Sequence, residues 1–234
     1  MLRIERLTAG YPGGGLVLQG VDLEIGEGEA TAILGRNGMG KTTLLKTIMG
    51  HVTPSSGLIS FCGRPIGRLA PFAISNLGIA YVPQGREIFA EFTVEENLLM
   101  GAIGKPAIPT KVPPHIYAQF PILAERRWQR AGTLSGGEQQ QLAVARALIG
   151  QPRLILLDEP SEGIQPSTAQ AIAASLKRIA ETAKLTLLLV EQNLETVFAL
   201  ASRCLFMEEG RIVHRTSVPD LARDPSLLHR YLSV

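Results

Sequence analysis

The sequence has few of the features that mark secreted, membrane-spanning or nucleic-acid-binding proteins. It contains only two cysteines, Cys62 and Cys204, in apolar strand-like runs without metal-ligand spacing, so we expect two buried free thiols and no disulfide framework. No apolar run approaches the ~20 residues that span a bilayer, and the first residues lack the apolar core of a signal peptide. With 23 basic and 21 acidic residues the net charge is only +2, which argues against nucleic acid as a partner. If the protein works at a membrane, we expect something other than its own sequence to hold it there.

Short apolar runs alternate with helix-like segments along the chain. Residues 154–157 and 185–190 are continuous apolar runs, as expected of strands covered on both faces. Between them, Pro166 opens a segment whose apolar residues recur at helical spacing, which predicts a strand–helix–strand crossover. Residues 21–25 instead alternate with a period of two. The pattern predicts an α/β fold with a mainly parallel central sheet.

The middle of the chain has a different pattern of residues, rich in proline. Thr93 and Glu96 form a capping box at the start of a helix, and five prolines between residues 106 and 121 break the chain into short pieces. We therefore expect a small helical lobe at residues 86–135, inserted into a core made of residues 1–85 and 136–234. A flexible linker between independent domains is the alternative.

One segment has the pattern of a phosphate-binding loop, G-x-x-x-x-G-K-T. It reads Gly35-Arg36-Asn37-Gly38-Met39-Gly40-Lys41-Thr42-Thr43 and lies between the apolar run 30–34 and a helix-like segment. A strand, a glycine-rich turn and a helix N-terminus together direct backbone N–H groups and a positive dipole at an anion. The segment predicts binding of a nucleoside triphosphate. An ordinary glycine-rich turn is the alternative, and the flanking strand and helix disfavour it.

Two later segments reinforce this interpretation. Ser135 and Glu138 form a second capping box, and the intervening Gly136 and Gly137 leave bare N–H groups where an anion could dock. The apolar run 154–157 then ends in Asp158 and Glu159, which places both carboxylates at the carboxyl edge of the sheet, where α/β folds bind ligands. Successive side chains diverge, so one carboxylate can face a metal and the other a water. A strand that merely ends in solvated acids is the alternative.

In this order and spacing, the phosphate loop, residues 134–138 and residues 154–159 resemble the nucleotide-binding subunit of ATP-binding cassette (ABC) transporters, over essentially the whole chain. Residues 83–89, 93–98, 162–166 and 190–193 resemble the ATPases of branched-chain amino acid importers, and residues 162–166 lean toward those of urea and short-chain amide importers. The resemblance implies a P-loop NTPase fold with an antiparallel β part and an inserted helical lobe. It also implies ATP hydrolysis that drives uptake of a small polar solute.

The resemblance assigns a role to each polar side chain of the expected site. Lys41 would reach the β- and γ-phosphates, Thr42 would ligate Mg²⁺, and Thr43 would help the loop N–H groups to hold the inner phosphates. Asp158 would hold Mg²⁺ or its water, and Glu159 would orient the attacking water. The implied cofactors are ATP and Mg²⁺.

Further positions carry over from the same family. Tyr11 resembles the aromatic that stacks on adenine, and Gln84 resembles the residue that touches the metal and reports its presence to the membrane subunit; an unliganded strand-edge tyrosine and a plain loop glutamine are the alternatives. The residues to which the resemblance assigns nucleotide contacts are Tyr11, Gly35, Arg36, Asn37, Gly38, Met39, Gly40, Lys41, Thr42, Thr43, Gln84, Ser135, Gly136, Gly137 and Glu138.

The chain departs from the usual family pattern at two positions. Gln192 stands where many ABC ATPases have a histidine that contacts the γ-phosphate, and Gln165 stands where many have an aspartate. An amide can donate a hydrogen bond but cannot become cationic or relay a proton. Importers of the branched-chain type show the same glutamine at 192, so we expect a subfamily trait with slow intrinsic turnover. The neutral Gln165 weakens the case for a charged link between ATPase subunits.

The resemblance also implies partners. The family pairs two ATPase subunits head to tail, each Ser135-to-Glu138 segment facing the other's phosphate loop, and a different chain is the expected second ATPase. Two membrane-spanning permease subunits would dock near residues 84–92, an external solute-binding protein would act indirectly, and the site of action would be the cytoplasmic face of the inner membrane.

Two other functions are alternatives. A regulatory GTPase would need an N-K-x-D run, and a ribosome- or DNA-directed ABC ATPase usually has tandem cassettes or a coiled-coil insert; the sequence has none of these.

Overall fold

The computed structural model describes residues 1–104, 110–224 and 226–232. Two of the prolines in the middle segment, at positions 106 and 109, lie outside the described residues. The strands are β1 Leu2–Gly10, β2 Leu16–Ile25, β3 Ala30–Leu34, β4 Pro54–Phe61, β5 Arg64–Pro65, β6 Ile79–Val82, β7 Leu154–Asp158, β8 Thr186–Val190, β9 Arg203–Glu208 and β10 Arg211–Ser217. The helices are α1 Lys41–Ile48, α2 Pro71–Asn76, α3 Val94–Met100, α4 Pro114–Gln119, α5 Pro121–Glu125, η1 Ala131–Thr133, α6 Gly136–Ile149, α7 Pro166–Ala183, α8 Leu194–Leu200, α9 Val218–Arg223 and α10 Ser226–Leu232.

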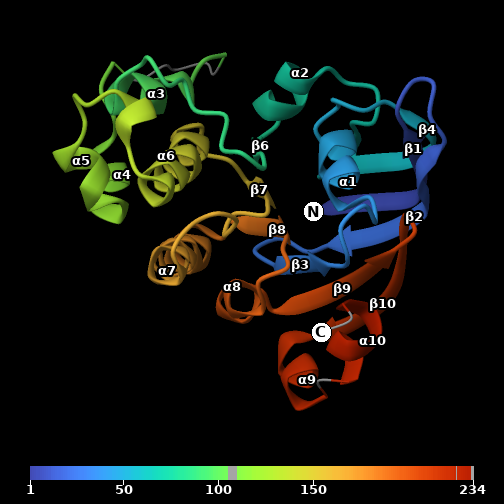
Figure 1. Ribbon diagram of the computed structural model, residues 1–234. Coiled ribbons are helices and arrows are strands. Elements are labelled where there is room, and N and C mark those ends of the chain that lie inside the picture. Colours follow the sequence, from blue (N-terminus) through green and yellow to red (C-terminus); the bar gives the residue numbers. More distant parts are fainter. Residues whose placement is uncertain (105–109, 225, 233–234) are drawn as a thin grey trace.

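Two sheets form the framework (Figure 1). One has the order β10-β9-β3-β8-β7-β6 and is parallel except for the β9–β10 pair, and the other has the order β2-β1-β4-β5 and is antiparallel. The backbone N–H of Gln19 in β2 donates to the carbonyl of Gly210 at 2.9 Å and links the two sheets. The predicted α/β class with a mainly parallel central sheet and an antiparallel part is confirmed.

The central strands are apolar on both faces because each face packs on a different core. Leu154 and Leu156 join the core that α1 shares with the antiparallel sheet, whereas Ile155 and Leu157 join the core beneath α6 and α7. All four side chains are fully buried. The continuous apolar runs of the sequence are therefore strands enclosed by two layers, as the pattern predicts.

Helices α3, α4 and α5 gather at one end of the molecule, beside α6 (Figure 1). Both predicted capping boxes are present: Thr93 Oγ1 accepts from the backbone N–H of Glu96 at 3.2 Å, and Ser135 Oγ accepts from that of Glu138 at 3.3 Å. Helix α6 packs on α3, α4 and α5 and also on β6 and α7. The division of the chain at residues 85 and 135 stays a prediction, because α6 joins the helical group to the sheet.

The expectation of two buried thiols is wrong for one cysteine. Cys204 lies fully buried in β9, where burial raises the pKa of its thiol to about 12. Cys62 is exposed, because it occupies the turn between β4 and β5 with a positive φ of 51° instead of continuing the strand. Both are free cysteines.

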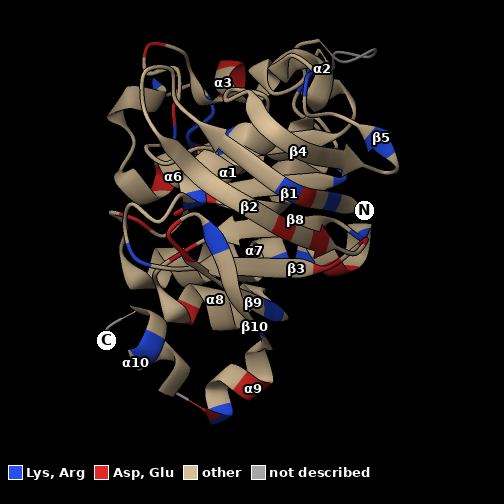
Figure 2. Cartoon of the chain, turned by 90° about the vertical axis from the view of Figure 1, so that its right-hand side faces the viewer, with Lys and Arg blue, Asp and Glu red and all other residues tan. Residues whose placement is uncertain are grey.

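The charged side chains are spread over the surface. Figure 2 shows basic and acidic positions interspersed along the strands and helices on this side of the molecule, without a block of either sign. Among the helices of the described residues, none combines the length and the apolar character needed to cross a bilayer.

Candidate functional site

The glycine-rich loop between β3 and α1 turns sharply, with backbone geometry that requires glycine at two positions. Gly40 caps α1 with a φ of 100°. A Cβ on Gly35 would lie 2.4 Å from the carbonyl oxygen of Met207 in β9. The loop therefore runs close over the sheet and delivers its N–H groups to the N-terminus of α1, the arrangement that favours bound anions.

Lys41 points back into this loop. Its side chain is only 5% exposed, and Nζ donates to the carbonyl oxygens of Gly35 at 2.6 Å and of Arg36 at 2.9 Å. Burial lowers the pKa of Lys41 from its ordinary value, and the negative charges of Glu159 and Asp158 oppose that shift. The loop thus holds a cation at its centre.

Asp158 is the buried carboxylate at the end of β7. It is 1% exposed, and its two oxygens accept from Thr42 Oγ1 and from the hydroxyl of Tyr81, both at 2.9 Å. Burial raises the pKa of Asp158, and the hydrogen bonds from Tyr81 and Thr42 oppose the rise. The structure brings Thr42 and Asp158 together, and the roles of both toward Mg²⁺ stay predictions. Tyr81 is a partner that sequence reasoning missed, because nothing in the β6 sequence distinguishes it from any strand tyrosine.

Glu159 and Gln192 meet above the loop. Gln192 Nε2 donates to Glu159 Oε1 at 2.8 Å and to Asn37 Oδ1 at 2.7 Å. Gln84 Nε2 lies 3.4 Å from Glu159 Oε2 and donates to Glu162 at 2.9 Å. Three loops that are far apart in the sequence therefore place an amide, a carboxylate and the phosphate loop side by side.

These groups line one cavity of about 580 Å³, to which Glu191, Ser161 and Glu162 also contribute. Sequence reasoning assigned no role to those three residues. The signal for Glu191 was available, since it is a carboxylate placed directly after the apolar strand β8. The residues that line the cavity are Val17, Asn37, Gly38, Gly40, Lys41, Thr42, Thr43, Gln84, Glu159, Ser161, Glu162, Glu191, Gln192 and Asn193.

Tyr11 borders the phosphate loop without lining this cavity. Its hydroxyl lies 3.4 Å from Thr43 Oγ1, and the side chain is 45% exposed. An exposed ring next to the loop has room to stack on a flat base. The adenine contact of Tyr11 stays a prediction.

The residues Ser135 to Glu138 do not line the cavity either. They form the first turn of α6, where a Cβ on Gly137 would lie 2.6 Å from Thr168 and one on Gly136 would lie 3.2 Å from Arg86 Nη1. Close packing on these neighbours is one reason for the two glycines. The predicted contact of this turn with a second subunit stays a prediction.

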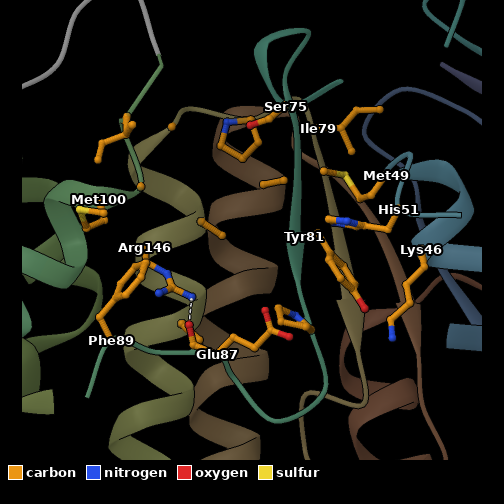
Figure 3. A pocket seen from close by; sticks show the side chains of 18 of the residues that line it. Lys46, Met49, His51, Ser75, Ile79, Tyr81, Glu87, Phe89, Met100 and Arg146 are labelled. Carbon is orange, nitrogen blue, oxygen red and sulfur yellow. Dashed lines mark hydrogen bonds between the residues drawn. The ribbon is translucent and has the colours of Figure 1, made fainter. Parts of the chain in front are cut away.

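A second cavity, a groove of about 800 Å³, lies between α3 and α6 on one side and α1 and β6 on the other (Figure 3). Phe89, Met100 and Arg146 form one wall, and Lys46 and His51 stand on the opposite one. The other lining residues labelled there are Met49, Ser75, Ile79, Tyr81 and Glu87.

Arg146 is the fixed part of the first wall of this groove. Its Nη2 donates to the carbonyls of Glu87 at 2.9 Å and of Arg86 at 3.2 Å, and its guanidinium lies 5.3 Å from the centre of the Phe89 ring. Burial lowers the pKa of Arg146. Phe89 remains 43% exposed and stacks on Phe92 with 5.3 Å between ring centres. The groove thus combines a held cation with open aromatic surface.

The comparisons with known proteins identify the family of this chain. The ABC transporter family model matches residues 18–162. The chain is 40% identical over 233 residues, 99% of each chain, to the high-affinity branched-chain amino acid transport ATP-binding protein BraG of Pseudomonas aeruginosa. It is 38% identical over 223 residues, 94% of each chain, to the probable branched-chain amino acid transport ATP-binding protein LivF of Archaeoglobus fulgidus.

Solved structures share the fold. A nucleotide-free ATP-binding cassette from an ABC transporter superposes with a TM-score of 0.80 at 28% identity over 97% of each chain. Another ABC transporter cassette, in its ADP conformation, gives 0.83 at 28% identity over 100% of this chain and 99% of its own. With its phosphate loop, buried aspartate and adjoining glutamate in place, the chain belongs to the ABC transporter family, as one of its ATP-binding, ATP-hydrolysing subunits.

Proposed function

We propose that this subunit powers an importer of branched-chain amino acids. The observation that carries the hydrolytic part of the proposal is the contact of Gln192 with both Glu159, at 2.8 Å, and Asn37 of the phosphate loop, at 2.7 Å. The solute class is supported by the two relatives at 40% and 38% identity, which are both named for branched-chain amino acid transport. The resemblance of residues 162–166 to urea and short-chain amide ATPases makes those solutes the second candidate.

Uptake by cells tests the solute. Deletion of the gene is expected to remove high-affinity uptake of radiolabelled leucine and to leave uptake of urea and acetamide unchanged, and a plasmid copy of the wild-type gene should restore it. Loss of urea or amide uptake with normal leucine uptake would transfer the assignment to the second class.

The residues at the loop also suit Mg²⁺. Thr42 Oγ1 and Asp158 Oδ1 lie 2.9 Å apart, and Gln84 can add its amide oxygen, so the donors are the hard oxygen ligands that Mg²⁺ prefers. The described residues contain no cluster of three or more His, Cys, Asp or Glu side chains that would hold a metal by themselves, which suits an ion held largely by substrate phosphates. When bound, Mg²⁺ would neutralise charge on the phosphates.

The side chains above the loop have complementary tasks in hydrolysis. Glu159 accepts hydrogen bonds and would orient the attacking water, since phosphoryl transfer depends mainly on positioning and charge stabilisation. Gln192 Nε2 already donates across the loop to Asn37, so the same N–H group can donate to a γ-phosphate oxygen. Lys41 would turn from the Gly35 and Arg36 carbonyls to the phosphates.

Gln192 sets an expectation for turnover. An imidazole that relays a proton contributes about 10²–10⁴-fold in rate, and an amide cannot do this. The isolated chain is therefore expected to hydrolyse ATP slowly, Gln192→His to be faster, and addition of a partner ATPase to raise the rate further. Steady-state phosphate release measures all three. Fast turnover of the isolated chain that is unaffected by Gln192→Ala would show that Gln192 is a bystander.

The working protein is proposed to be a pair of ATPase subunits, the second a different chain, on the cytoplasmic face of the inner membrane. The Ser135-to-Glu138 turn lies outside the cavity, which is the reason to expect that a second subunit supplies this turn to each nucleotide. Two permease subunits would hold the pair at the membrane, and an external solute-binding protein would deliver the solute.

The groove of Figure 3 is the proposed docking site for a permease subunit. Phe89→Asp combined with Phe92→Asp is expected to spare the ATPase activity of the isolated chain and to abolish its co-purification with the permease, because two charges replace the stacked pair Phe89–Phe92, of which Phe89 lines the groove. Leu58→Asp is the matched control, since Leu58 is 45% exposed, close to the 43% of Phe89, and lies on the antiparallel sheet. Normal co-purification of the double variant would refute the assignment.

A further inference from the structure

Glu191 is a buried carboxylate directly after β8, and its side chain is 2% exposed. Its backbone N–H donates to the carbonyl of Ile33 in β3 at 3.3 Å, which fixes it at the edge of the sheet. A carboxylate in such a place costs several kcal/mol of folding free energy unless hydrogen bonds compensate it. The partners of its two oxygens therefore indicate what it holds.

Each oxygen of Glu191 binds a different loop. Oε1 accepts from the backbone N–H of Ser161 at 2.9 Å and also from the Ser161 hydroxyl. Oε2 accepts from the backbone N–H groups of Gln192 at 2.8 Å and of Asn193 at 2.9 Å. Ser161 belongs to the turn that follows Glu159, so one carboxylate bridges the turn after β7 and the loop after β8.

These two loops carry the pair of side chains that meet over the phosphate loop. Glu159 adopts a positive φ of 48°, and its backbone N–H donates to the carbonyl of Val190 at 2.9 Å. Gln192 is exposed, so the packing of its side chain does not fix its place. The hydrogen bond from the backbone N–H of Gln192 to Glu191 fixes the position of Gln192. That position allows Gln192 Nε2 to reach Glu159.

We propose that Glu191 is a positioning residue for ATP hydrolysis, which locks the Ser161 turn to the Gln192 loop and so holds Glu159 and Gln192 in register. The inference rests on the proposed roles of Glu159 and Gln192. Glu191 acts through those two residues and leaves the phosphates to the loop around Lys41. Its loss should therefore slow turnover more than it weakens ATP binding.

A carboxylate is required for this task because it meets only donors. Three backbone N–H groups and one hydroxyl converge on its two oxygens. In Glu191→Gln one oxygen becomes an NH₂ group that faces N–H donors of one loop, and that loop must move away. Glu191→Asp keeps both acceptor oxygens on a shorter side chain and should hold the loops in part.

Kinetics of the purified full-length chain test the proposal. Glu191→Gln is expected to lower kcat by about 10–100-fold, since an error of about 1 Å in catalytic geometry costs up to about 10²-fold. The dissociation constant of ATP, measured by fluorescence titration, should change by about twofold or less, and Glu191→Asp should recover part of the kcat. Glu195→Gln is the matched control, an exposed glutamate in α8 whose carboxylate lies 3.4 Å from Gln170 Nε2; it should keep the wild-type kcat.

Ser161→Ala keeps the proposal testable if Glu191→Gln fails to fold. It removes only the hydroxyl donor, should lower kcat by a smaller factor at unchanged ATP affinity, and should add little to Glu191→Gln in the double variant, because both act on one contact. Wild-type kcat in Glu191→Gln, or unchanged kcat in Ser161→Ala where the first variant is unfolded, would overturn the inference. Glu159→Gln in the same assay distinguishes failure of the positioning role from failure of the proposed site. If Glu159→Gln is inactive while Glu191→Gln is active, only the positioning role of Glu191 is refuted. If Glu159→Gln is active, the proposed catalytic site itself is refuted.

Discussion

Replacing Glu159 by glutamine is expected to lower ATP turnover by about 10²–10⁴-fold while ATP still binds, because the variant removes the group that orients and polarises water. The amide has the shape of the carboxylate, so the turn after β7 need not move. It also still offers one oxygen to the Gln192 amide, which donates to Glu159 at 2.8 Å in the wild-type chain. The loss therefore falls on the chemical step.

Phosphate release and ATP binding are measured separately for this variant. ATP that binds most tightly to the closed pair of subunits stabilises that pair until the ATP is hydrolysed. Dimers of Glu159→Gln should therefore accumulate in size-exclusion chromatography with ATP and Mg²⁺. Glu195→Gln is again the control, because it removes an exposed carboxylate from the neighbouring α8. Near-normal hydrolysis by Glu159→Gln would contradict the role given to Glu159.

Local patterns predicted the parts of the fold that local chemistry decides. The apolar run at residues 154–157 is a fully buried strand, and Thr93 and Ser135 cap helices as their spacing to Glu96 and Glu138 indicates. Each of these features depends on residues within a few positions of one another. Periodicity and capping carry such information in one stretch of sequence.

The missed contacts join residues that are distant in sequence. Tyr81 donates a hydrogen bond to Asp158, 77 positions away in the sequence, and Ser161 donates one to Glu191, 30 positions away. Both contacts exist only because parallel strands bring their carboxyl ends to one edge, and no local pattern records which side chains then meet. Cys62 was misplaced for a related reason, since an apolar neighbourhood predicts burial but does not show where β4 ends and a turn begins.

Lys41→Ala is expected to weaken ATP binding itself. A hydrogen bond made by a charged group contributes about 1.5–3 kcal/mol, which corresponds to a dissociation constant raised roughly 10- to 150-fold. Lys41 is suited to this role because its ammonium is already inside the loop, 2.6 Å from the Gly35 carbonyl and 2.9 Å from that of Arg36. The cost of burying the charge is met in the folded chain, so little ordering remains when the phosphates arrive.

The variant also takes a donor from two carbonyl groups, so a weakened loop must be distinguished from a lost phosphate contact. Lys41→Arg keeps the charge on a bulkier head and should bind ATP better than Lys41→Ala if charge is the deciding factor, whereas both should fail alike if only the fit inside the loop matters. Lys177→Ala, which removes an exposed lysine from α7, should match the wild type in affinity and in melting temperature. Titration with a fluorescent ATP analogue gives the dissociation constants of the three variants. An unchanged dissociation constant in Lys41→Ala would contradict a phosphate-binding role for the loop, because the nucleotide would then bind without a cation at the centre of the loop.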